Sequence, residues 1–169
     1  ESIDDGVGLI MKKLGELGLD RDTIIIFSSD NGGETNITSN SPLRGGKSQL
    51  YEGGIRVPLI VRWLGKIPSG KVSSQPTVNI DFYPTLLEAA KVLPSKKHRL
   101  DGISILRNWI NPTSRLSRDE IYWHYPLAKP HFLGGISGGA ILSGDWKLIE
   151  AFDTKKVELY NLTEDISEK

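Results

Sequence analysis

The sequence predicts an α/β fold in which a mostly parallel sheet with flanking helices is followed by a small antiparallel subdomain. Apolar residues recur at steps of three and four from Ile3 to Leu17, which predicts an amphipathic helix that Gly18 ends. The β-branched run TIIIF at 23–27 then predicts a strand buried on both faces. A helix that leads into a buried strand is typical of an α/β layer.

Two further elements extend this layer. VPLIVRW at 57–63 predicts a second strand, and IDFYPTLLEAAKVL at 80–93 predicts a helix that Asp81 caps, with Pro84 in its first turn. Residues 29–55 are rich in Gly, Ser and Asn and predict a long loop at the carboxyl end of the first strand, where ligands of open α/β sheets bind. The expected buried face of the helix consists of Leu86, Leu87, Ala90 and Leu93.

The pattern changes after about residue 113. Four short strand-like runs, EIYWHY, GAILS, WKLIEAF and VELYNL, are separated by turns that contain glycine or charged residues. This arrangement predicts a small antiparallel sheet. We therefore predict two domains, residues 1–112 and residues 113–169, with their boundary in the loop NPTSRLSRD.

Composition excludes several classes of partner and site. The 169 residues include 21 basic and 21 acidic side chains, so the charge balance gives no reason to expect a nucleic acid or an anionic membrane as partner. The absence of cysteine excludes disulfides, thiolate zinc sites and a cysteine nucleophile within this stretch. The chain begins without Met and already inside a helical pattern, so we expect it to be a fragment.

The pair Asp30-Asn31 is a candidate metal site, because it places two oxygen ligands directly after a strand. Oxygen ligands without a nearby His or Cys favour Ca²⁺ or Mg²⁺ over zinc. Two ligands are too few for either ion, so others must come from elsewhere in the fold. The residues alone leave open the more common arrangement, a turn in which both side chains bond their own backbone.

The segment GGKS at 45–48 resembles the end of a phosphate-binding P-loop, but Ser41 stands where that motif requires its first glycine. The helix that should follow is also missing, since QLYEGG breaks after six residues. Lys47 remains a candidate for binding an anionic group through its compact positive charge. The alternative is that it is a solvated surface lysine.

Taken in order, TIIIFSSDNGG, SPLRGGKSQLYEGGIRVPLIVRW, NIDFYPTLLEAA, LDGISIL, GDWKLIE and VELYNLTED resemble the C-terminal part of the sulfatase family, within the alkaline phosphatase superfamily. The likeness is to the arylsulfatase and N-acetylgalactosamine-6-sulfatase type. It implies that Asp30 and Asn31 are ligands of one Ca²⁺ and that Lys47 contacts the sulfate and acts in catalysis. Relatives that use two zinc ions tend to have Asp-His at this point, so Asn31 favours calcium.

The resemblance also implies what lies outside this chain. The nucleophile of the family is a formylglycine made from Cys or Ser in an N-terminal segment, which this sequence does not contain. We therefore expect the chain alone to be inactive and the parent enzyme to hydrolyse the sulfate ester of a carbohydrate or an aryl group. Periplasmic or secreted localisation is implied in the same way. A sheet without its other strands is also expected to self-associate.

Two other functions stay open. One is a phosphonate or phosphate ester hydrolase of the same superfamily, and the other is a non-catalytic module that binds calcium or a glycan. His124, between two aromatic residues in YWHYP, is a candidate substrate contact that donates a hydrogen bond to a sugar hydroxyl. The more common alternative is a histidine packed at the edge of a sheet.

Overall fold

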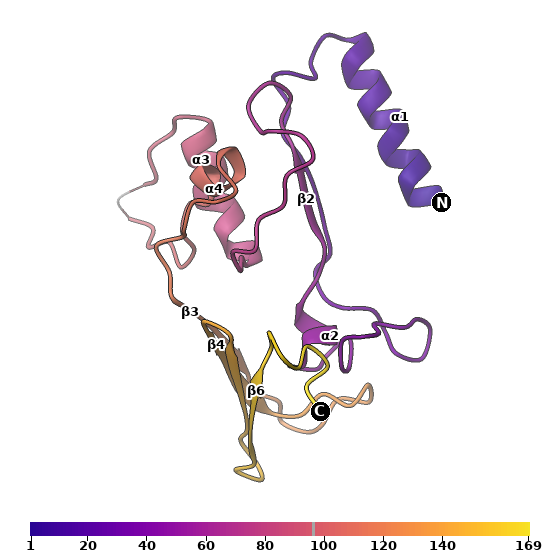
Figure 1. Ribbon diagram of the computed structural model, residues 1–169, viewed down its shortest axis with the longest axis vertical. Helices are drawn as coiled ribbons and strands as arrows, with labels where there is room; N and C mark the ends of the chain where they lie inside the picture. The colour runs from indigo at the N-terminus through magenta and orange to yellow at the C-terminus, as the bar shows by residue number, and fades with distance from the viewer. Residues whose placement is uncertain (96) are drawn as a thin grey trace. The chain divides into compact units, whose positions relative to one another are not determined.

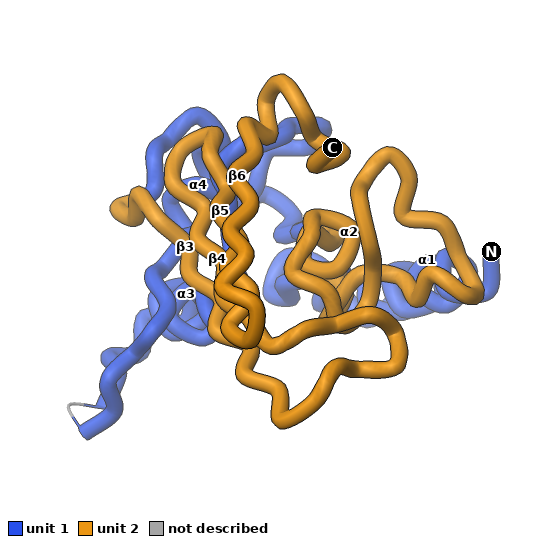
Figure 2. The backbone as a smooth tube through the Cα atoms, turned by 90° about the horizontal axis from the view of Figure 1, so that it is seen from below, with its two compact units in different colours: residues 1–27, 59–116 blue, residues 28–58, 117–169 orange. Residues whose placement is uncertain are grey.

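The computed structural model describes residues 1–95 and 97–169, which form two compact units. Unit 1 consists of residues 1–27 and 59–116, and unit 2 of residues 28–58 and 117–169 (Figure 2). The helices and strands that Figure 1 labels are numbered in chain order.

Unit 1 contains the helix, strand and helix that the N-terminal sequence predicts. Helix α1 spans Ser2–Glu16, and β1 (Ile25–Ser28) pairs with β2 (Leu59–Arg62) in a two-stranded sheet. The helix expected at 80–93 is shorter, because a 3-10 turn, η1 (Asn79–Asp81), precedes α3 (Phe82–Ala89). A further short helix, α4, follows at Leu106–Ile110.

The apolar stripe of α1 is not covered by the described residues, since Ile3 is 70% exposed and Ile10 is 59% exposed. Two burial predictions for unit 1 are wrong. Strand β1 is only partly buried, because β2 is its single partner in the described sheet. The buried residues of α3 are Pro84 and Thr85 and not the predicted leucines, because that side packs towards the fully buried Ile105.

Asp81 acts differently from the predicted helix cap. It occupies the N-cap position of α3 but makes no side-chain cap bond there. Its carboxylate accepts the backbone N–H groups of Val78 and Ile103, each at 3.0 Å. Asp81 therefore joins the turn before α3 to the segment before α4.

Unit 2 contains the predicted antiparallel sheet, whose strands run in the order β3, β4, β5, β6. Side chains alternate between the two faces of each strand. On the inner face, Ala140 of β4 pairs with Ile149 of β5, and both pack against Leu50 from the long loop. The four strands span Glu120–Tyr125, Gly138–Ser143, Trp146–Ala151 and Val157–Asn161.

The compact units group the chain differently from the predicted domains 1–112 and 113–169, because residues 28–58 belong with the antiparallel sheet. The domain division concerns the complete fold and stays a prediction, as does the mostly parallel sheet. What the structure shows is a mixed α/β chain with one antiparallel four-stranded sheet. Within residues 1–95 and 97–169, no helix is long and apolar enough to cross a membrane.

We expect this chain to self-associate in solution, because large apolar side chains are exposed in both units, such as Leu9 at 69% and Leu159 at 57%. Sedimentation velocity should show an average sedimentation coefficient that rises with protein concentration. Leu9→Lys and Leu159→Lys should each reduce that rise. A single monomeric species over the whole concentration range would contradict the prediction.

Candidate functional site

The loop after β1 folds back on the segment that contains Lys47. Gly32 donates its N–H to the Gly54 carbonyl at 2.9 Å, and a Cβ at Gly32 would lie 1.7 Å from the carbonyl oxygen of Gly53. Only glycine fits such a close approach between two backbones. Gly32, which follows the Asp-Asn pair, is therefore packed directly against Gly53 and Gly54 of α2 (Glu52–Ile55).

The side chain of Asn40 holds the same two segments together. Its amide oxygen accepts the N–H of Gly33 at 3.0 Å, and its amide nitrogen donates to the carbonyl groups of Gly33 and Gly45 at 2.8 and 3.0 Å. The backbone N–H of Lys47 also donates to the Gly33 carbonyl, at 3.1 Å. Residues 30–33 and 45–47 consequently lie side by side, as a shared site for a metal ion and an anion requires.

The oxygen atoms of Asp30 and Asn31 are available to a ligand. Asp30 is exposed, and within the described part of the chain its carboxylate accepts no hydrogen bond. Asn31 donates its amide N–H to the Gly32 carbonyl at 3.0 Å, which leaves its amide oxygen free. The alternative turn, in which both side chains bond their own backbone, forms only in part, since Asn31 makes such a bond to Gly32 and Asp30 makes none among the described residues.

The donor set fits calcium in kind but not in number. A carboxylate and an amide oxygen are ligands that Ca²⁺ prefers, and Ca²⁺ takes six to eight oxygens. No group of three or more His, Asp or Glu side chains in residues 1–95 and 97–169 is arranged to hold a metal ion. These two side chains would therefore supply only part of the ligand shell of a calcium ion.

Lys47 lies in a tight turn and points its charge into solvent. Its side chain is exposed, and no described residue pairs with its ammonium group. The next residue, Ser48, has a left-handed backbone with φ of 72°, and its buried hydroxyl has no partner among the described residues. No long helix follows Ser48, since α2 begins at Glu52 and has four residues, so the structure also lacks the arrangement of a P-loop.

His124 does not lie with these residues. It belongs to the outer face of the sheet, where it pairs with Gly139 and its ring centre is 5.4 Å from that of Phe152. The segment that follows Lys47 packs on the opposite, inner face through Leu50. The structure thus places the backbone of Lys47 beside Gly33, two residues after Asn31, and places His124 on the other face of the sheet.

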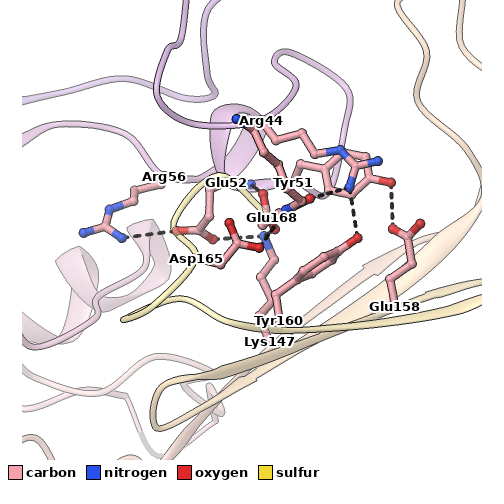
Figure 3. A network of polar contacts seen from close by, with 10 residues as sticks. Arg44, Tyr51, Glu52, Arg56, Lys147, Glu158, Tyr160, Asp165 and Glu168 are labelled. Atoms are coloured by element: carbon pink, nitrogen blue, oxygen red, sulfur yellow. Dashed lines mark hydrogen bonds and ion pairs between the residues drawn. The ribbon is translucent and has the colours of Figure 1, made fainter.

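A buried ionic cluster that the sequence analysis missed consists of Glu52, Lys147 and Glu168 (Figure 3). Lys147 of β5 is fully buried, and its Nζ lies 2.9 Å from Glu52 Oε1 and 2.8 Å from Glu168 Oε1. The second carboxylate oxygen of Glu168 accepts the backbone N–H of Glu52 at 2.7 Å. The sequence WKLIEA could have indicated that Lys147 is buried, because side chains alternate along a strand and Lys147 lies on the same face as Ile149 and Ala151.

A second set of contacts adjoins this cluster. The Arg44 guanidinium donates to the Glu168 carbonyl at 2.6 Å and to the Tyr160 hydroxyl at 2.9 Å, and it lies 3.9 Å from the centre of the Tyr51 ring. Tyr51 donates its hydroxyl to the Glu158 carboxylate at 2.7 Å. Burial, with this bond to Glu158, raises the pKa of Tyr51 to about 12, so the phenol remains a donor at neutral pH.

An open pocket of about 780 Å³ lies elsewhere in unit 2, between residues 35–45 and 167–169. Hydroxyl and amide side chains such as Thr38 and Asn40 line it, together with Arg44. Neither Lys47 nor the Asp-Asn pair contributes to its wall. We therefore assign it no part in the chemistry of the site.

Comparison with protein families identifies one match to this chain. The family model named Sulfatase matches residues 1–92. A protein named Sulfatase from Formosa agariphila is 36% identical over 187 residues, which cover 99% of this chain and 33% of that protein. Steryl-sulfatase of Mus musculus is 35% identical over 156 residues, which cover 87% of this chain and 24% of that protein. The chain thus spans a third or less of the length of these relatives.

Solved structures share the fold. One is the structure of BT4656 in complex with its substrate D-glucosamine-2-N,6-O-disulfate, which matches with a TM-score of 0.80 and 29% sequence identity. The matched region covers 98% of this chain and 33% of the BT4656 chain. A phosphonate monoester hydrolase from Silicibacter pomeroyi has a TM-score of 0.74 and covers 95% of this chain and 33% of that one. Its identity is 22%, so this second likeness concerns the fold alone.

Lys147→Met should lower the free energy of unfolding of this chain by about 3–5 kcal/mol, because it leaves two buried carboxylates without their cation. Urea unfolding followed by circular dichroism measures the change. The matched control is Lys13→Met, which removes an exposed pair with Glu16 and should cost less than about 1 kcal/mol. Equal losses in the two variants would contradict the prediction.

Glu168→Gln extends this test to pH. Burial raises the pKa of Glu168 above its ordinary value of 4.5, against the opposing effect of its bonds to Lys147 and to the Glu52 backbone. The folded state therefore binds this proton more tightly than the unfolded state, and the resulting stabilisation is lost as the pH rises through the raised value. Wild type should lose more unfolding free energy than Glu168→Gln over that rise. Parallel curves would contradict this.

Proposed function

We propose, because this chain belongs to the sulfatase family, that the complete protein hydrolyses sulfate monoesters and that Lys47 contacts the sulfate. The supporting observation is the position of Lys47, whose exposed ammonium has no partner in the described part of the chain and whose backbone bonds to Gly33, beside the Asp-Asn pair. A cation left unpaired next to two free oxygen ligands suits a substrate that carries an anionic group and also contacts a metal ion.

In this proposal Lys47 donates hydrogen bonds to a nonbridging oxygen of the sulfate. The ammonium is a compact charge with three donors, so it holds one oxygen without imposing a planar geometry. Negative charge on the sulfate oxygens grows as the ester bond breaks, so the contact is stronger in the transition state than with bound substrate. That difference is what lowers the barrier.

Asp30 and Asn31 would hold a calcium ion at the same place. A calcium ion, when bound, offsets negative charge on the sulfate oxygens. The remaining ligands and the formylglycine nucleophile belong, in this proposal, to a part of the protein outside this chain. The chain by itself would then bind the anion weakly and turn over nothing.

The proposed substrate class is a sulfated carbohydrate or an aryl sulfate. Support for a carbohydrate comes from the bound D-glucosamine-2-N,6-O-disulfate of BT4656. We further propose periplasmic or secreted localisation and a mostly parallel sheet in the complete fold. Contact between His124 and a sugar hydroxyl stays a prediction, and it needs a substrate that extends to the outer face of the sheet.

The alternative functions have less support. The phosphonate monoester hydrolase likeness is one of fold and does not favour phosphonate chemistry over sulfate chemistry. If the protein is instead a non-catalytic module, the complete protein should bind calcium or a glycan and should not turn over a substrate. Assays of the complete protein on an aryl sulfate and on a phosphonate ester separate the three functions.

Lys47→Ala in the complete protein should lower kcat/KM for an aryl sulfate by roughly a hundredfold, the scale expected when one charge-stabilising donor is lost. Lys47→Arg should restore only part of the rate, because a planar fork replaces a compact ammonium. Lys71→Ala, which removes another exposed lysine, is the control and should leave kcat/KM unchanged. A loss below about threefold for Lys47→Ala would identify Lys47 as a surface lysine.

Asp30→Ala should abolish both activity and bound calcium, because it removes a charged ligand. Asn31→Ala removes a neutral ligand, so added calcium should restore part of its activity. Atomic emission measures the calcium content of the purified protein, and Asp153→Ala, at another exposed aspartate, is the control. Unchanged calcium and rate in both site variants would show that the Asp-Asn pair is not a metal site.

A further inference from the structure

We propose that Glu52, Lys147 and Glu168 are positioning residues that fix the turn carrying Lys47, an inference that rests on the proposed sulfate contact of Lys47. None of the three is exposed enough to reach a substrate, since Lys147 and Glu168 are fully buried and Glu52 is 5% exposed. Their action would therefore be through the backbone of the turn.

The turn is fixed at both of its ends. Residues 44–53 form a closed loop, because the N–H of Gly53 donates to the Arg44 carbonyl at 2.7 Å. At one end Arg44 bonds to the Glu168 carbonyl, and at the other the Glu52 carboxylate bonds to Lys147. Lys47 lies between these two ends, so a shift of either anchor moves its Cα.

The middle of the turn needs such restraint. Ser48 keeps a left-handed backbone, which is strained for a residue with a side chain and persists only where surrounding contacts determine it. Gln49 contributes one such contact by donating its side-chain amide to the Leu133 carbonyl at 2.8 Å. The ammonium of Lys47 has no partner of its own in the described chain, so the contacts that restrain this residue are those of its backbone.

Stability alone does not account for the cluster. Buried ion pairs are often no better for stability than apolar side chains of similar volume, because removing the charges from water offsets their attraction. Apolar side chains at these three positions would not form directional hydrogen bonds, so they would not fix how the segments are oriented. Glu168 uses one carboxylate oxygen for Lys147 Nζ and the other for the Glu52 N–H, so it fixes both the strand and the start of α2.

Glu168 is itself held in a defined place. Its backbone is left-handed, with φ of 52°, and its N–H donates to the Asp165 carbonyl at 3.2 Å. Arg44 then bonds to its carbonyl group while Lys147 bonds to its carboxylate (Figure 3). The cluster therefore joins three segments that are distant in sequence, namely the Lys47 turn, β5 and residues 165–168.

A double-mutant cycle in the complete protein tests this inference. Lys147→Met and Glu168→Gln are each made in the wild-type and in the Lys47→Ala background, and kcat and KM are measured for an aryl sulfate. In the wild-type background Lys147→Met should lower kcat about ten- to a hundredfold, the cost of a misplaced catalytic group. In the Lys47→Ala background the same change should have almost no effect, because the group it positions is gone.

Each outcome of the cycle is decisive. Equal losses in the two backgrounds would overturn the inference, since the cluster would then act on the whole fold. No loss in the wild-type background would overturn it as well. If Lys147→Met does not fold, Glu168→Gln should show the same pattern with a smaller loss. The effect of Lys47→Ala alone tests the proposed function separately, because it does not involve the cluster.

Hydrogen exchange on the complete protein gives a readout apart from activity. In Lys147→Met the amides of Lys47 and Gly53, which bond to the Gly33 and Arg44 carbonyls, should exchange faster relative to amides of β4 and β5. Lys13→Met should change neither group. Uniform acceleration of both groups in Lys147→Met would show that the cluster stabilises the unit as a whole and does not position the turn.

Discussion

The buried ammonium of Lys147 between the carboxylates of Glu52 and Glu168 is the interaction on which the arrangement of unit 2 depends. Moving a charge out of water costs several kcal/mol per ion, and the attraction repays this only when every partner lies at hydrogen-bonding distance. The partners come from α2, β5 and the segment after β6. These three segments therefore have few placements that satisfy the charges, and the fold adopts one of them.

Close backbone packing supplies the second constraint on the site. The loop between β1 and α2 has little apolar core, since among the described residues it contributes only Leu50 and the partly buried Tyr51 to the cluster with Ala140 and Ile149. Main-chain contacts replace that core, and a Cβ at Gly46 would lie 2.3 Å from the Gly33 carbonyl oxygen. The oxygens of the Asp-Asn pair and the Lys47 charge thus sit on a backbone framework that tolerates little displacement.

Residue patterns that span only a few positions in the sequence correctly predicted where helices and strands form. Steps of three and four residues identified α1, and alternation identified the four strands of the sheet to within about two residues. The burial of those elements was predicted less well. Leu93 is 90% exposed although its spacing placed it on a buried face, because burial depends on what packs against an element and not on its own periodicity.

By itself, the sequence determined the local elements, the family resemblance, and the choice of Asp30, Asn31 and Lys47 as the residues of interest. Only the tertiary structure decided that the Lys47 backbone bonds to Gly33, that His124 faces the other side of the sheet, and that Lys147 has two acidic partners. The physical reason is distance along the chain. Glu52 is 95 residues from Lys147, and no local preference of either residue specifies a contact over that separation.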